Sequence, residues 1–194
     1  MNRLHHLYCR SAHWRSTLEH LVPWAVADVD LGEHVLELGP GHAPVMPLLK
    51  SRTNRVTAID NDALAIAGLR RQPASCLVRG DAIDLPFATG SFSAVVGFTM
   101  LHHIPTTVLQ QRLFREVLRT LRPGGLFVGI DVRFSFAVWL FHLGDTYCAM
   151  PADQAGARLA SVGFEDVTID RQPRVFRFRA RRPKTLRMAH VPPA

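Results

Sequence analysis

One glycine turn and one later acid have the types and spacing needed to bind a nucleotide-like ligand. Glu37 and two glycines, Gly39 and Gly41, follow a short apolar run of the kind that forms a buried strand. The glycines permit a sharp turn that brings a ligand against bare backbone. Asp60 lies 21 residues after Gly39, close to the roughly 20 expected of an acid that accepts hydrogen bonds from ribose hydroxyls. An alternative role for Asp60 is to cap a helix, for which Asp62 is better placed.

Two adjacent histidines, His102 and His103, are the candidates for proton transfer, because imidazole titrates near neutral pH. The alternative is that both are structural or line the edge of a cofactor. Near the N-terminus, His5, Cys9 and His13 would share one face of a helix, where they could bind a metal. A plain amphipathic helix explains the same spacing, and we expect no metal.

An α/β fold is needed to position these groups. Apolar runs around residues 35–38, 55–60, 76–78, 91–96 and 126–131 alternate with helical patterns, which is typical of a parallel sheet with ligands at its carboxyl edge. Segments 167–170 and 175–180 are expected to be the last two strands, with Phe176 and Phe178 facing the core.

Local signals predict where several helices begin and end. Ser11 is expected to cap a helix that Pro23 ends or bends, and Thr107 and Gln110 are expected to form a capping box. A helix over 152–161 is expected to end at Gly163.

Four motifs resemble the class I S-adenosylmethionine-dependent methyltransferases of small molecules. The family's first motif, E/D-x-G-x-G-x-G, stands here at 37–43, with Ala43 replacing the third glycine. It is followed by G-D-A at 80–82 and L-H-H at 101–103. The fourth motif, L-R-P-G-G-x-L, stands at 121–127, with Phe127 in its last position. The resemblance covers about residues 33–132. It implies a Rossmann-like α/β fold: a seven-stranded, mostly parallel sheet, last strand antiparallel, with helices on both faces.

The resemblance also implies S-adenosyl-L-methionine as cofactor, with Asp60 at its ribose and Asp81 and Ala82 at its adenine. The full set of expected cofactor contacts is Glu37, Gly39, Gly41, Asp60, Asn61, Asp81, Ala82 and Phe98. The amino-methyltransferase signature N-P-P-Y is absent. A nicotinamide-dependent oxidoreductase is an alternative, but Pro44 occupies the third glycine position of the dinucleotide fingerprint. A non-catalytic binding protein with this fold is a second alternative.

The chain is expected to form one domain with two appendages. Residues 1–31 would be a helical lid, residues 32–181 the methyltransferase domain and residues 182–194 a basic tail. An insertion at 133–150 contains an apolar stretch, 134–143, that would either help to form the acceptor site or simply pack in the core. The first reading favours a small, lipid-like acceptor, methylated by in-line displacement.

Charge and cysteine content limit the partners. Of the net charge of +7, the chain beyond residue 170 contributes eight Lys and Arg and no acid. This basic end is either solvated or attracted to an anionic membrane. No nucleic acid is expected, because Phe176 and Phe178 are predicted to face the core and would not stack on bases. The chain has three scattered cysteines, which is typical of a reduced protein. It shows neither an apolar run near 20 residues nor a secretory signal, so we expect a cytoplasmic protein.

Overall fold

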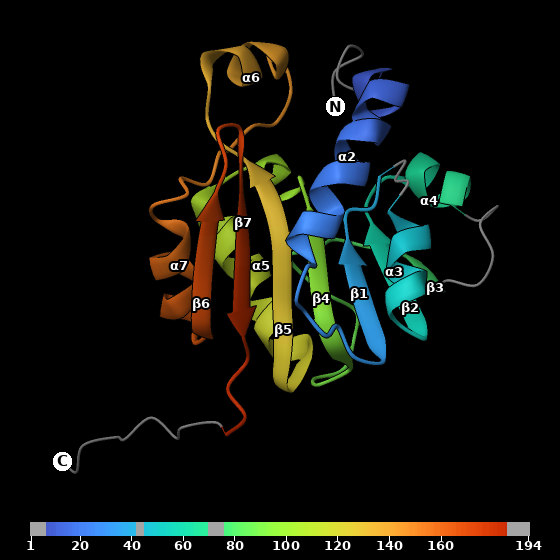
Figure 1. Cartoon of the computed structure of the whole chain (residues 1–194), viewed down its shortest axis with the longest axis vertical. Helices are drawn as coiled ribbons and strands as arrows, with labels where there is room; N and C mark the ends of the chain where they lie inside the picture. The colour runs from blue at the N-terminus through green and yellow to red at the C-terminus, as the bar shows by residue number, and fades with distance from the viewer. Residues whose placement is uncertain (1–6, 42–44, 70–75, 186–194) are drawn as a thin grey trace.

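A seven-stranded sheet forms the centre of the protein (Figure 1). The computed structural model describes residues 7–41, 45–69 and 76–185. The strands run in the order β3-β2-β1-β4-β5-β7-β6, and only β7 is antiparallel to its neighbours. Their bounds are β1 His34–Leu38, β2 Arg55–Asp60, β3 Cys76–Arg79, β4 Phe92–Phe98, β5 Leu121–Val132, β6 Glu165–Arg171 and β7 Val175–Arg181. This confirms the expected doubly wound sheet.

Helices cover both faces of the sheet, as expected. One face packs on α5 and α7, and the other on α2 and α3. The helices in chain order are α2 Ala12–Ala25, α3 Met46–Arg52, α4 Ala63–Leu69, the 3₁₀ turn η1 Leu101–His103, α5 Thr107–Thr120, α6 Phe136–Phe141 and α7 Ala155–Val162. Because both faces are covered, the residues of β1 and β4 are almost all buried instead of alternating between buried and exposed.

The sheet reverses its winding direction between β1 and β4. Strands β2 and β3 lie on one side of β1, and β4 and β5 lie on the other. The chain segments that leave β1 and β4 therefore diverge, and this is where a doubly wound fold receives its ligand. The carboxyl ends of these strands point to the top of Figure 1, the end at which α6 and the start of α2 project.

Two of the expected helix boundaries are confirmed. The Ser11 hydroxyl accepts the Trp14 N–H at 3.1 Å, and Gly163 ends α7 in the left-handed region at φ +111°. Pro23, however, does not end α2, which continues to Ala25. Ala25, the last residue of this helix, is fully buried.

The predicted capping box at Thr107 and Gln110 is wrong by one residue. Thr106 is the N-cap of α5, with its hydroxyl accepting the Leu109 N–H at 3.2 Å. Gln110 is instead fully buried, and its amide nitrogen donates to the carbonyls of Leu101 at 3.0 Å and Cys148 at 2.7 Å. Buried carbonyls need donors, and here the tertiary fold supplies them from the side chain expected to cap the helix.

Candidate functional site

The glycine turn after β1 is tied directly to the acid at the end of β2. Gly39 and Gly41 adopt φ angles of +60° and +57°, a region that favours glycine. The Asp60 carboxylate accepts the Gly41 N–H at 3.0 Å through one oxygen and the Asp62 N–H at 2.9 Å through the other. A side chain on Gly41 would meet none of the described residues within 4 Å, so on their side the backbone of the turn is open to a ligand.

Glu37 brings an acidic group into the sheet just behind this turn. Its side chain is 2% exposed, and its Oε2 atom has no hydrogen-bond partner among the described residues. Burial, with a smaller contribution from the nearby Asp60 charge, raises the pKa of Glu37 to about 8. A buried carboxyl in this state lacks a positive partner, and a cationic ligand would supply one.

The raised pKa of Glu37 predicts how stability depends on pH. Between about pH 4.5 and 8, the unfolded chain is ionised at Glu37 while the folded chain is protonated. The folded state therefore holds the extra proton, and the free energy of unfolding falls as pH rises, by up to about 1.4 kcal/mol per pH unit. Glu37→Gln cannot titrate, so its pH profile should be flatter than that of the wild type. Urea unfolding of both proteins at about pH 5, 7 and 9 measures the difference, and parallel profiles would disprove the shift.

The remaining expected cofactor contacts follow or end β2, β3 and β4, at the same edge of the sheet. Asp81 is exposed, and its carboxylate accepts the Ile83 N–H at 3.1 Å, while Ala82 is half-buried beside it. Asn61 is exposed next to Asp60. The side chain of Phe98 is 7% exposed and packs in the core on the α2 and α3 face. Ala43 and Pro44 lie outside the described residues.

The segment after β4 places the two expected histidines differently. Thr99 has φ +55°, which is rare for a β-branched residue and common at functional sites. Its amide is held by the Ile130 carbonyl at 2.8 Å, and the 3₁₀ turn η1 follows. His102 is buried, with its Nδ1 2.5 Å from a carboxylate oxygen of Asp131, whereas His103 is half-buried.

Three residues that the sequence analysis missed join these histidines. Asp131, at the end of β5, is fully buried and also accepts the His102 N–H at 3.0 Å. The His142 ring lies 5.3 Å from that of His102, and the Tyr147 ring lies 4.6 Å from that of His142. An acid at the end of an apolar strand was a usable signal for Asp131. Nothing in the spacing of His142 or Tyr147 pointed to this cluster.

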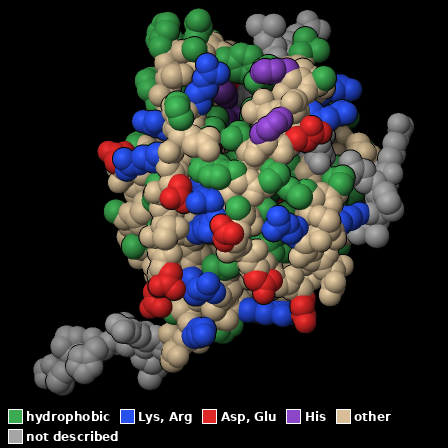
Figure 2. All heavy atoms as spheres, viewed as in Figure 1, with side chains coloured by type: hydrophobic (Ala, Val, Ile, Leu, Met, Phe, Trp, Pro, Cys, Tyr) green, Lys and Arg blue, Asp and Glu red, His purple; other side chains and the backbone are tan. Residues whose placement is uncertain are grey.

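The apolar segment after β5 is not core packing. Helix α6 has no buried residues, and the large apolar side chains around it are exposed: Phe134, Phe136, Trp139, Leu140 and Leu143. Figure 2 shows hydrophobic side chains gathered at this end of the molecule. The Tyr8 ring lies 5.2 Å from that of Phe141, so the N-terminal segment reaches α6. The lid role of residues 1–31 remains a prediction.

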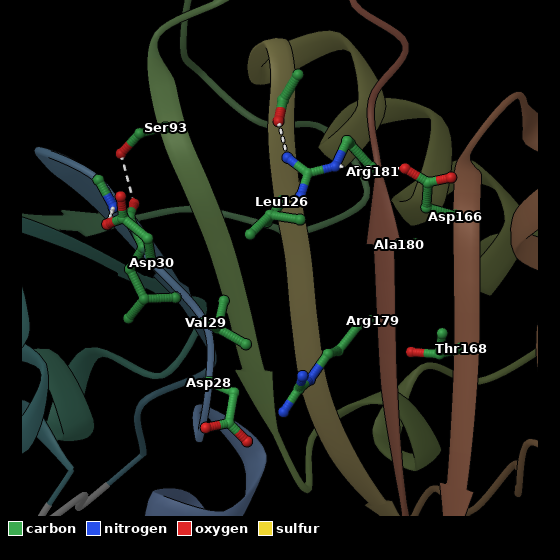
Figure 3. Close-up of a pocket in the computed structure, with 13 residues that line it drawn as sticks. Asp28, Val29, Asp30, Ser93, Leu126, Asp166, Thr168, Arg179, Ala180 and Arg181 are labelled. Atoms are coloured by element: carbon green, nitrogen blue, oxygen red, sulfur yellow. Dashed lines mark hydrogen bonds and ion pairs between the residues drawn. The ribbon is translucent and has the colours of Figure 1, made fainter.

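A separate hollow of about 550 Å³ lies at the opposite edge of the sheet. Figure 3 shows that Asp28, Val29 and Asp30, from the chain between α2 and β1, line it opposite Arg179 and Arg181 on β7. Gly32, Ser93 and Gly124 place it at the amino ends of β1, β4 and β5. It is therefore remote from the glycine turn. Asp30, Ser93 and one Arg179 nitrogen bond within the protein, whereas the buried Arg179 Nε has no partner among the described residues.

Arg177, Arg179 and Arg181 alternate along β7 within the basic end of the chain, and most of their bonds are to groups of the protein itself. Arg177 pairs with Asp170 at 2.5 Å and donates to the Trp24 carbonyl, and Arg179 donates to the Ala27 carbonyl. Arg182, the first residue of the expected tail, is 8% exposed and donates to the Leu121 carbonyl, so it belongs to the fold. The segment 186–194 lies outside the described residues. Contact of the tail with a membrane remains a prediction.

None of the helices in the described segments combines the length and apolarity needed to cross a membrane. Cys9 and Cys148 are half-buried, Cys76 is exposed, and all three are free.

Comparison with known proteins identifies the family. Residues 36–129 match the family model described as "Methyltransferase domain". The chain is 35% identical over 139 residues to a fatty-acid O-methyltransferase of Mycolicibacterium smegmatis, which covers 68% of this chain and 49% of the relative. It is 38% identical over 112 residues to the phthiotriol/phenolphthiotriol dimycocerosates methyltransferase of Mycobacterium tuberculosis, covering 54% of this chain and 40% of the relative. The chain thus spans about half the length of these relatives.

Solved structures agree on the fold. Phosphoethanolamine N-methyltransferase 2 of Haemonchus contortus, in complex with S-adenosyl-L-methionine, superposes with a TM-score of 0.71 at 16% identity. The superposition covers 87% of this chain and 52% of that one. At this identity the likeness concerns the fold alone.

Proposed function

Since this chain belongs to the class I S-adenosylmethionine-dependent methyltransferases, we propose the following reaction for it. The protein transfers a methyl group from S-adenosyl-L-methionine to a small, apolar acceptor. The observation that carries the proposal is the bond between the Gly41 amide and the Asp60 carboxylate at the switch point of the sheet. It joins the glycine turn and the ribose acid, the two parts that a nucleoside ligand needs, into one unit.

The residues present fit this cofactor. S-adenosylmethionine carries positive charge on its sulfonium and on its amino group, and Glu37 is a buried acid without a positive partner. The open backbone at Gly41 leaves room for the ligand beside it. Asp60 retains lone pairs for a ribose diol, since each oxygen accepts one described hydrogen bond and a carboxylate has about four acceptor sites.

For methyl transfer, the main task of the protein is to position the cofactor and the acceptor. The cofactor supplies an electrophilic methyl group on a sulfonium. Gly39 and Gly41 would approach its methionine portion, Asp60 would hold its ribose and Asp81 would hold its adenine. The remaining work is to hold an acceptor atom in line at about 3–3.5 Å and to exclude water. His102 and His103 lie at the carboxyl end of β4, on the acceptor side of this arrangement.

The apolar side chains around α6 support an apolar acceptor. They rise beyond the same edge of the sheet as the glycine turn, and the N-terminal segment meets them through Tyr8 and Phe141. Exposed apolar groups next to a reaction site favour a ligand that covers them. The names of the two mycobacterial relatives, which act on a fatty acid and on a phthiotriol lipid, support the same class.

A transfer assay with methyl-labelled S-adenosylmethionine tests the proposal. The acceptors are long-chain fatty acids and alcohols, acetate as a short carboxylate, and an oligonucleotide and a peptide as macromolecules. We expect label in the solvent-extractable fraction with the long-chain compounds and none with acetate, because only the former bury apolar surface at α6. Label found only in the macromolecules, or no binding of the cofactor, would refute the proposal.

A further inference from the structure

Three histidines from two distant segments converge at the acceptor side of the site. One nitrogen from each of His102, His103 and His142 lies within 4.8 Å of the others. A tetrahedral zinc site with bonds of 2.0–2.1 Å places its nitrogens about 3.4 Å apart, so small ring rotations suffice to close this group. Among the described residues, no other group of histidine, cysteine and acidic side chains meets this criterion.

Two of the three rings are already held in the tautomer that a metal requires. The Nδ1 of His102 lies 2.5 Å from the Asp131 carboxylate, and the Nδ1 of His142 lies 2.7 Å from the Val138 carbonyl. Both partners can only accept, so each Nδ1 carries the proton and each Nε2 keeps its lone pair. A metal-binding histidine almost always donates its other nitrogen to a carboxylate or carbonyl in this way.

Hydrogen bonds from buried polar groups hold the two segments of the histidine cluster together. The Gln110 amide bridges the carbonyls of Leu101 and Cys148, and the Cys148 N–H bonds the His102 carbonyl at 2.7 Å. These bonds attach the segment after α6 to the η1 turn. Tyr147, whose ring contacts two of the histidines, has a buried hydroxyl without a partner among the described residues. A buried polar atom of this kind calls for a ligand.

We propose that His102, His103 and His142 bind a divalent transition-metal ion of the zinc type, with Asp131 orienting His102. Three neutral imidazoles suit zinc, and three protein ligands leave the fourth position open. Asp131 would act as a positioning residue, because its carboxylate bonds the ring and the backbone N–H of His102 and is not one of the three proposed ligands.

The open position has a use if the proposed methyl transfer is right, and this step rests on that proposal. Met100, two residues before His102, packs within 3.2 Å of the place where a side chain on Gly39 would begin. The cluster is therefore adjacent to the glycine turn. A carboxylate oxygen of the acceptor would bind the metal and be held for attack on the methyl group. The new O–CH₃ bond would form as the methyl–sulfur bond of the sulfonium breaks, which leaves a neutral thioether, and no proton needs to be removed. His102 would then be a ligand and not a base, because one lone pair cannot serve both purposes.

Zinc binding is measured without cofactor or acceptor, so its outcome is independent of the methyl-transfer assay. Chelator-treated protein is titrated with Zn²⁺ alone by calorimetry, and Co²⁺ is used as a spectroscopic probe of tetrahedral coordination. We expect one zinc per chain. His103→Ala and His142→Ala should each weaken binding by about 100-fold or more, and Asp131→Asn by about 10–100-fold. His103 is half-buried, so its variant is the one expected to keep the fold.

His13→Ala is the matched control, because His13 belongs to the other candidate metal face near the N-terminus. It should bind zinc as the wild type does. The proposal is overturned if the wild type binds no stoichiometric zinc, if folded His103→Ala and His142→Ala bind it normally, or if His13→Ala loses it. If zinc binds at the cluster but its removal leaves transfer to a long-chain carboxylate unchanged, the acceptor role is overturned.

Discussion

Replacing Asp60 by alanine is expected to weaken S-adenosylmethionine binding by at least about 100-fold. Two hydrogen bonds to a charged acceptor are lost, each contributing roughly 1.5–3 kcal/mol. The substitution also removes the acceptor of the Gly41 N–H, so the glycine turn loses its attachment to β2. Calorimetric titration with the cofactor measures the change, and parallel titration with NAD separates the methyltransferase from an oxidoreductase.

Two further variants make the Asp60 result interpretable. Asp60→Asn keeps an oxygen for the Gly41 amide but removes the charge, so its affinity should lie between those of the wild type and Asp60→Ala. Asp62→Ala is the control, since Asp62 caps the next helix through the Leu64 N–H and is not an expected ligand residue. It should cost about 1 kcal/mol of stability and little affinity. Cofactor affinity within about threefold of the wild type in folded Asp60→Ala would remove Asp60 from the site.

Replacing Gly129 by alanine is expected to be the most damaging single-methyl change in the core. Gly129 lies in β5 between β4 and β7. An added Cβ would lie 2.2 Å from the Gly97 carbonyl oxygen and 2.5 Å from the ring of Phe178. The first neighbour is backbone and the second is fully buried, so neither can move aside cheaply. We expect a loss of about 3 kcal/mol or more, and a melting temperature lower by at least roughly 6 °C.

Gly156→Ala is the matched control for this prediction. Gly156 lies inside α7, and an added Cβ there would meet only the Ile169 side chain at 3.6 Å, an ordinary contact. Alanine should stabilise the helix by roughly 0.5–1 kcal/mol. Thermal melting of the three proteins gives the order directly. A Gly129→Ala protein that melts with the wild type would show that β4 and β7 can separate at this point.

The candidate cofactor site could be predicted largely from the sequence because its parts are local. A glycine turn follows β1, and Asp60 follows β2, and parallel strands bring their carboxyl ends to one edge whatever the helices between them do. The bond between Gly41 and Asp60 is what that geometry implies. The Phe98 side chain is the exception, because strand alternation turns it into the core.

The acceptor side could not be predicted in the same way, because its contacts join segments far apart in the chain. Gln110 had the spacing of a capping residue, yet it serves two buried carbonyls, one of them 38 residues away. The arginines of β7 resembled a solvated basic stripe, but backbone carbonyls of the α2 end and nearby acids engage them. Which polar partner a long side chain reaches depends on packing, and local periodicity carries no information on it.

By itself, the sequence determined the order of the strands and helices along the chain, the doubly wound sheet, and the edge of that sheet at which the candidate cofactor residues gather. Hydrophobic periodicity and glycine turns specify these features within short windows of chain. Only the tertiary structure decided that the apolar residues at α6 are exposed, that Gly129 admits no side chain, and that His142 meets His102, which is itself bonded to Asp131. These depend on distances between segments separated by dozens of residues, which are set when the two faces of the sheet are packed.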